Sequence, residues 1–287
     1  MKERIINTEE TYLRLIEEEY NNRSTRTIKS TFHEDLANFK NDFELKVKQF
    51  VLEETREQQD LRIDIITSAE LKIGIDSGYD GTALYLQSDK YKSGELYIIS
   101  QGSQDIKDWE YNAKSMLAGL NINQAKSANH FINVVKEHLN ISKHVPVIGL
   151  SHSLAHNNNL TTHLLYDTFD EIYSVNGAQT NYYQLFLEDR QFTQRVIKEF
   201  SLPTSDTLAI YDLDPSELHD FAQEFYNDKI PVVNQRISTD DPLYALNTAR
   251  GFFQLGNVEY IDTNPDYPGL HSIMKKLPDD IVHCYGL

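Results

Sequence analysis

The sequence has a single cysteine, Cys284, among its 287 residues, and basic side chains are the minority of its charges. One cysteine excludes an intramolecular disulfide and any metal site built from several thiolates. The chain has 27 Lys and Arg against 44 Asp and Glu, a formal net charge of −17 at pH 7. This charge argues against nucleic acid as a partner, because phosphates would be repelled. No cluster of His and carboxylates has metal-ligand spacing, so we expect neither a metal nor a cofactor.

Long apolar runs are also missing. Nowhere do 18 uncharged apolar residues follow one another, and the start MKERIINTEETYLRLIEEEY contains no apolar signal-peptide core. We therefore expect no transmembrane span and no cleaved signal peptide. The expected location is cytoplasmic, or outside the cell after export without a cleaved signal. Glycine and proline are few, and 40% of the residues are hydrophobic, which fits one large or two smaller globular domains.

The first 60 residues are rich in Glu, Lys, Arg and Gln and carry apolar residues at helical spacing. Two such stripes stand out, formed by Tyr12, Leu15, Ile16 and Tyr20 and by Phe32, Leu36, Phe39 and Phe43. We predict that residues 1–60 form an N-terminal segment of amphipathic helices and that residues 61–287 form the main domain.

From about residue 61 the sequence alternates strand-like and helical runs. LRIDII, TALYLQ and ELYIIS are typical of strands, and QAKSANHFINVVKEHLN has a helical stripe before the strand-like VPVIGL. This alternation predicts an α/β fold, a mostly parallel sheet with helices on both faces. Residues 181–228 are too long for an ordinary connection and predict a helical insertion.

Residues 149–156 read GLSHSLAH and directly follow the predicted strand VPVIGL. A strand that turns sharply into a helix presents a serine hydroxyl at the helix N-terminus, provided that the positions two before and two after it are small. Both Ser151 and Ser153 satisfy this condition. On sequence pattern alone Ser151 is favoured, because Gly149 stands two residues before it.

This segment resembles the Gly-His-Ser-Leu-Gly-Gly elbow of class 3 lipases, where His precedes and Leu follows the nucleophile. The resemblance assigns the nucleophile to Ser153, between His152 and Leu154. Upstream, ISQGSQDIKDWEYN is similar to the family's Arg-Gly-Thr/Ser turn and Asp-Trp segment, although Gln101 replaces the arginine; the matching residues are Gly102, Ser103, Asp108 and Trp109. The resemblance implies an oxyanion hole made by the N–H groups of Leu154 and Ser103.

A serine nucleophile needs a histidine base and a carboxylate that orients it, in the chain order Ser, Asp or Glu, His. STDDPLY follows the strand-like IPVVNQRI, similar to the family's strand followed by Asp-x-Val-Pro, and we choose Asp241 over Asp240. His271 and His283 are the candidate bases. We favour His271, which follows the loop NPDYPG and begins an apparent helix.

These residues together predict an α/β-hydrolase domain of the class 3 lipase type that cleaves carboxylic esters, with lipid or phospholipid as the substrate class. The lipid assignment rests on the resemblance, because the same triad would serve a short-chain esterase. Similar bacterial lipase and phospholipase domains occur in secreted toxins, including type VII effectors with helical segments for chaperone or immunity partners. The alternative prediction is a hydrolase-fold binding or toxin-partner module whose N-terminal helices recruit another protein.

Overall fold

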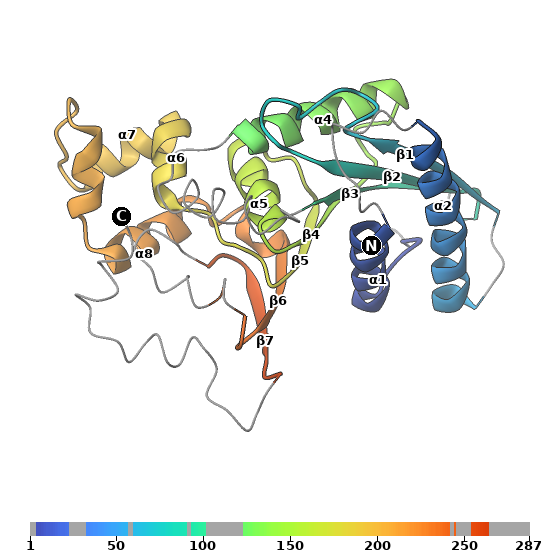
Figure 1. Ribbon diagram of the computed structural model, residues 1–287. Coiled ribbons are helices and arrows are strands. Elements are labelled where there is room, and N and C mark those ends of the chain that lie inside the picture. Colours follow the sequence, from blue (N-terminus) through green and yellow to red (C-terminus); the bar gives the residue numbers. More distant parts are fainter. Residues whose placement is uncertain are drawn as a thin grey trace.

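A seven-stranded sheet runs through the part of the chain that the computed structural model describes, residues 4–22, 33–56, 60–90, 93–101, 123–241, 244 and 254–263. Its strands lie in sequence order (Figure 1): β1 (Leu61–Thr67), β2 (Gly81–Ser88), β3 (Ser93–Ser100), β4 (Val147–His152), β5 (Glu171–Val175), β6 (Val233–Ser238) and β7 (Asn257–Ile261). The first three strands are antiparallel, and β3 to β7 are parallel. The predicted α/β class with a mostly parallel sheet is confirmed.

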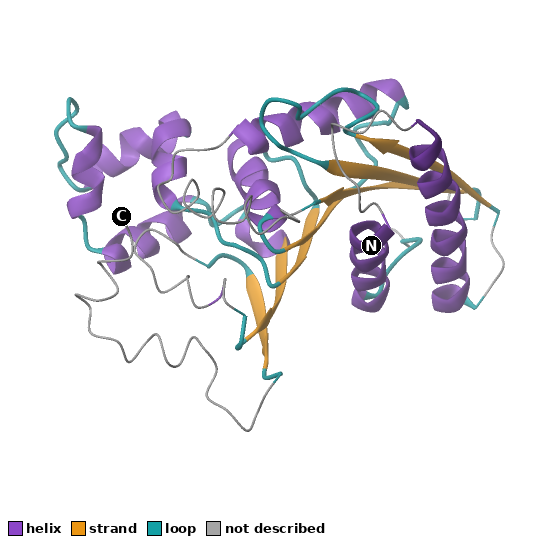
Figure 2. Ribbon diagram, in the orientation of Figure 1, coloured by secondary structure: helices purple, strands orange, loops and turns teal. Residues whose placement is uncertain are grey.

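The helices form two layers, one on each face of the sheet (Figure 2). The connections between β3 and β6 contain α4 (Asn123–His138), α5 (Ala155–Tyr166), α6 (Tyr182–Glu188), α7 (Arg190–Glu199), α8 (Pro215–Phe225) and the 3-10 helices η1 (Thr207–Asp212) and η2 (Ile230–Val232). All these crossovers move the same way across the sheet, and right-handed crossovers in one direction place their helices on one face. The other face is covered by α1 (Glu9–Asn22) and α2 (His33–Thr55).

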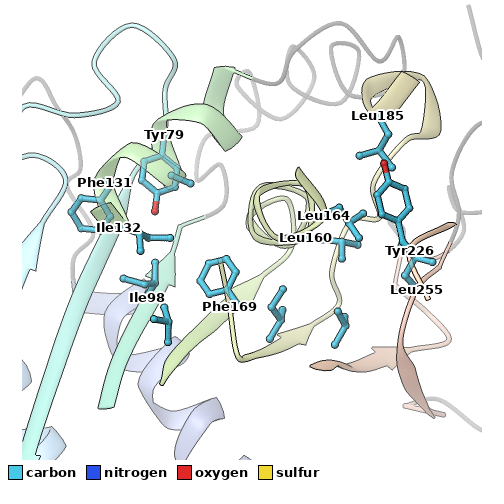
Figure 3. Close-up of a cluster of buried hydrophobic side chains, with 14 of the residues drawn as sticks. Tyr79, Ile98, Phe131, Ile132, Leu160, Leu164, Phe169, Leu185, Tyr226 and Leu255 are labelled. Atoms are coloured by element: carbon cyan, nitrogen blue, oxygen red, sulfur yellow. The ribbon is translucent and has the colours of Figure 1, made fainter. Parts of the chain in front are cut away.

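Two clusters of buried apolar side chains hold these layers together. The larger one joins the sheet to α4–α8, and Figure 3 shows Ile98, Phe131, Leu160 and Leu164 within it. The second joins the opposite face of the sheet to α1 and α2, with Tyr12, Leu15, Ile16, Phe43, Val47, Leu84, Tyr97, Ile99, Leu150 and Tyr173 among its members. Successive residues of β3 alternate between the clusters, as the strand pleat requires. Packing is therefore continuous across residue 60, and the apolar stripe of α1 is buried on the sheet.

A buried carboxylate fixes the residues before α1 to the start of β3. Glu95 is 1% exposed and accepts the N–H groups of Ile5 and Ile6 at 2.8 and 3.3 Å. The Tyr97 hydroxyl donates to the same carboxylate at 2.6 Å, and burial raises the pKa of Glu95. Ion pairs add to this attachment: Arg4, before α1, pairs with Glu171, and Glu9, the first residue of α1, pairs with Arg236.

The predicted insertion at 181–228 contains α6, α7, η1 and α8, which Figure 1 shows at the end of the molecule remote from α1 and α2. Each of its α-helices is directly preceded by a residue whose side chain accepts a backbone N–H of the first turn: Asn181, Asp189 and Asp214. Its aromatic side chains lie in the larger cluster, including Tyr182, Tyr183, Phe186 and Phe192.

Candidate active site

Ser153 lies in the turn between β4 and α5, at the carboxyl edge of the sheet. Its φ is +59°, in the left-handed region that residues other than glycine seldom adopt. The next residue, Leu154, already has the right-handed angles φ −59° and ψ −25°, and α5 begins after it. The strand thus becomes a helix within two residues, which is the conformation that a nucleophile elbow requires.

Three backbone hydrogen bonds hold this turn. The N–H of Ser153 donates to the carbonyl of Val175 at 3.2 Å, and its own carbonyl accepts from His156 at 3.1 Å and from Ala178 at 3.0 Å. Val175 ends the neighbouring strand β5, and Ala178 lies in the loop that follows. A strained φ persists when the surrounding structure fixes it at several points, as these bonds do here.

The surroundings of the turn leave room for small residues only. The positions two before and two after Ser153 are Ser151 and Ala155, and both side chains are completely buried. Gly177 follows β5, and a Cβ atom there would lie 2.6 Å from the ring of His156 on α5. The loop after β5 therefore packs directly on the first turn of the helix that Ser153 precedes.

The structure separates the two candidate serines. β4 extends to His152, two residues beyond the predicted strand VPVIGL, so Ser151 lies inside the strand. Its side chain is 0% exposed, and Oγ has no hydrogen-bond partner within the described residues. Ser153 is only partly buried. A nucleophile must meet its substrate, so this difference favours Ser153.

The two candidate acids follow β6, two strands from β4, and they face different neighbours. Burial lowers the pKa of His152, the residue before Ser153, and the charge of Asp241 opposes that effect. Asp240 instead accepts a hydrogen bond from the hydroxyl of Thr263 at 2.8 Å, beyond the end of β7. Of the two candidate acids, Asp241 is therefore the one whose charge acts on His152, next to Ser153.

The remaining predicted site residues fall into two groups. Leu154 precedes the first turn of α5, where backbone N–H groups lack acceptors within the helix and can bind an anion. Ser103, His271 and the alternative base His283 lie outside the described residues.

The sequence did not predict that the last turn of α1 reaches this edge of the sheet. The ring centroids of Tyr20 and His152 lie 5.4 Å apart, and the two ring planes are nearly perpendicular. Beside it, the buried carboxylate of Glu19 accepts hydrogen bonds from Thr82 Oγ1 at 2.8 Å and from Gln101 Nε2 at 3.0 Å. The signals in the sequence were slight, an acidic residue next to the apolar stripe and Gln101 in place of arginine.

His156, one helical turn after the elbow, is a buried neutral imidazole. It is 0% exposed, and within the described residues neither ring nitrogen has a hydrogen-bond partner. Burial lowers its pKa from 6.5 to about 3. The folded state therefore resists protonation of a group that the unfolded chain protonates below about pH 6.5.

We predict that this histidine makes the protein sensitive to acid. The pKa of His156 is depressed in the folded state. Its contribution to the free energy of unfolding is therefore fully present above about pH 6.5 and is lost as the pH falls toward about 3. The free energy of unfolding should fall by about 1.4 kcal/mol per pH unit from this group alone. His156→Leu should remove that slope, as measured by urea unfolding at several pH values between 7 and 4.

The control for this measurement is His130→Asn, which changes an exposed histidine of α4. It should retain the slope of the unmodified chain. Parallel stability curves for the unmodified chain and His156→Leu would contradict the prediction, whatever their vertical offset.

Within the described ranges, no three side chains of His, Cys, Asp or Glu are arranged to hold a metal ion. None of the helices in those ranges combines the length and the apolar character needed to cross a bilayer.

Comparison with known proteins gives a family but no activity. Residues 10–262 match the sequence profile of a domain of unknown function, DUF6792. This range contains Ser103, Ser153 and Asp241 and ends before His271. The putative uncharacterized protein YvcB of Bacillus subtilis (strain 168) is 35% identical over 290 aligned positions, which cover 97% of this chain and 45% of that relative. The chain thus spans less than half the length of the curated relative.

Proposed function

The chain belongs to the DUF6792 family, and we propose that it is a serine hydrolase of carboxylic esters with an α/β-hydrolase fold of the class 3 lipase type. The observation that carries the proposal is the left-handed conformation of Ser153, φ +59°, at a turn from a parallel strand into a helix. Such strain at a partly exposed serine is expected where the hydroxyl must be presented to a substrate.

In the proposed reaction, Ser153 Oγ attacks the acyl carbon while His271 accepts its proton. The oxyanion of the tetrahedral intermediate receives hydrogen bonds from the N–H groups of Leu154 and Ser103. Collapse of the intermediate expels the alcohol, which takes the proton from the histidine. Water then attacks the acyl-enzyme while His271 accepts its proton, and that proton passes to Ser153 Oγ as the bond to the enzyme breaks and the carboxylic acid leaves. Asp241 holds the imidazole in the tautomer that this proton transfer needs.

The proposed substrate class is a lipid or phospholipid ester. The support for it is the resemblance of GLSHSLAH and of the segment around Trp109 to class 3 lipases. A short-chain esterase would use the same triad, so chain length has to be measured. The protein should be incubated with p-nitrophenyl esters of two to sixteen carbons and with phospholipid vesicles, and the released fatty acids identified. A preference for short esters with no release from vesicles would assign the esterase.

The test of the hydrolase itself is a fluorophosphonate probe, which labels only an activated serine. The probe should label the unmodified chain, and peptide mapping should place the label on Ser153. A chain that hydrolyses no ester and takes up no label would contradict the proposal and leave the fold as a binding module.

We predict that Asp241→Asn lowers kcat by about 10⁴-fold, because the histidine loses the carboxylate that fixes its tautomer. Asp240→Asn is the matched control, since its carboxylate bonds to Thr263 and should change kcat by only a few-fold. Steady-state hydrolysis of a p-nitrophenyl ester measures both. Equal losses would mean that the two acids act through the structure of the turn after β6.

A further inference from the structure

Glu19 is an acidic residue of α1 that is buried against the sheet. Its side chain is 1% exposed. Each of its two carboxylate oxygens accepts a hydrogen bond from a different part of the sheet. Oε1 accepts from Thr82 Oγ1 on β2 at 2.8 Å, and Oε2 accepts from Gln101 Nε2, directly after β3, at 3.0 Å. One carboxylate thus ties the helix to the start of β2 and to the end of β3.

Helix stability does not explain the position of this carboxylate. α1 ends at Asn22, so Glu19 lies in its last turn, where the helix dipole disfavours negative charge. Burial of a carboxylate also costs free energy unless hydrogen bonds compensate for it. The two hydrogen bonds compensate for the burial of Glu19, so its place at the unfavourable end of the helix dipole is the preference that it violates. A residue that violates a local preference is a candidate for a functional task.

The atoms that Glu19 holds lie at the edge of the sheet that carries the elbow. β3 and β4 are adjacent parallel strands, with Ser100 opposite Ser151 in register. Gln101, directly after β3, therefore lies beside the residues that lead into Ser153. The neighbouring Tyr20 contacts the ring of His152, which precedes Ser153, so the last turn of α1 contacts both strands.

We propose that Glu19 is a positioning residue of the active site. It holds Gln101, and through Gln101 the end of β3, at a fixed distance from the elbow on β4. The N-terminal helix is thereby part of the catalytic apparatus, although it supplies no reacting group. This inference rests on the proposed hydrolase function, because it concerns the geometry around the same serine.

The test compares Glu19→Gln, Gln101→Leu and the double variant in the full chain, with Glu17→Gln as the control on the exposed side of α1. For each we would measure kcat and KM on a short p-nitrophenyl ester, the rate of fluorophosphonate labelling, and the melting temperature. We expect Glu19→Gln to lower kcat and the labelling rate by about tenfold or more with KM within about twofold, because misplaced groups lose transition-state stabilisation. Since both residues act as a unit, the double variant should lose no more than the worse single variant.

The outcomes separate this inference from the proposed function. No label on the unmodified chain would overturn the function and the inference together. A labelled unmodified chain whose Glu19→Gln variant keeps kcat and labelling rate, with only a lower melting temperature, would overturn the inference alone. If Glu19→Gln fails to fold, Gln101→Leu is measured in its place. An unchanged kcat and labelling rate in Gln101→Leu would overturn the inference as well.

Discussion

Replacing Ser153 with alanine will lower kcat for ester hydrolysis by about 10⁵- to 10⁶-fold, the loss expected when a nucleophile is removed from a serine triad. The same change will abolish covalent labelling by a fluorophosphonate. Ser151→Ala, two residues away, will keep kcat within a few-fold of the unmodified chain.

The structural reason for this contrast is the place of each serine relative to the end of β4. Ser151 lies within the strand, is paired with Ser174 of β5 and is fully buried. Ser153 lies in the turn with the left-handed φ and is partly exposed. Because the hydroxyl of Ser151 has no described hydrogen-bond partner, its removal should leave stability unchanged or raise it.

Labelling and kinetics measured on the same two variants decide the prediction. Label retained in Ser153→Ala and lost in Ser151→Ala would move the nucleophile to Ser151. That result would also mean that the left-handed backbone conformation of Ser153 serves only to form the turn between β4 and α5.

A second large effect is expected at His271. His271→Ala should reduce kcat by about 10⁵- to 10⁶-fold, because the serine would lose its base, whereas His283→Ala should reduce it little. Both positions lie outside the described residues, so the prediction rests on sequence order and on the reach of the chain.

The distance across the sheet from β7 to β4 is shorter than the length to which the segment before His271 can extend. Three strand spacings separate β7 from β4, or about 14 Å at ~4.8 Å each. The segment 262–271 follows β7 and, with ten residues, can extend over about 33 Å. Since β4 and β7 belong to the parallel part of the sheet, both end at the same edge. A segment of this length is therefore long enough to bring His271 to the elbow.

The pH dependence of kcat/KM adds a check on the base. The unmodified chain should lose activity as the pH falls through the pKa of one group, and His283→Ala should retain that profile. A large loss in His283→Ala with an active His271→Ala would transfer the role of base to His283.

The parts of the fold that local sequence determines were predictable. The strand LRIDII corresponds to β1, and QAKSANHFINVVKEHLN corresponds to α4 within two residues at either end. Apolar periodicity identifies such elements because each has one consistently buried face. The turn after β4 was also predictable, since small residues follow an apolar run there. The local pattern alone favoured Ser151, and only the resemblance assigned the nucleophile to Ser153, because the choice depends on where the strand ends, a boundary that pairing with β5 sets.

Other features depend on partners far along the chain and left little trace in the local pattern. α5 reads AHNNNLTTHLLY, yet its residues from Ala155 to Leu164 are all buried. Its amides are accommodated by distant groups: Asn157 bonds to the carbonyl of Gln179, and Asn158 to the side chain of Gln124, both at 2.8 Å. Periodicity treats such amides as exposed, so it could not identify this helix as buried. For the same reason the contact of Glu19 with Gln101 was not foreseen.

The docking of α1 has a consequence for how the protein is made. α1 is synthesised before most of the sheet on which it packs: its partners there include Tyr173, and Arg4 and Glu9 pair with Glu171 and Arg236. Contacts across so many residues close late and slow folding. Until β5 has been synthesised, α1 can pack on α2, β2 and β3 but not on Tyr173. The full set of contacts of α1 can therefore form only after β6 has been synthesised, which makes the docking of this helix a late step of folding.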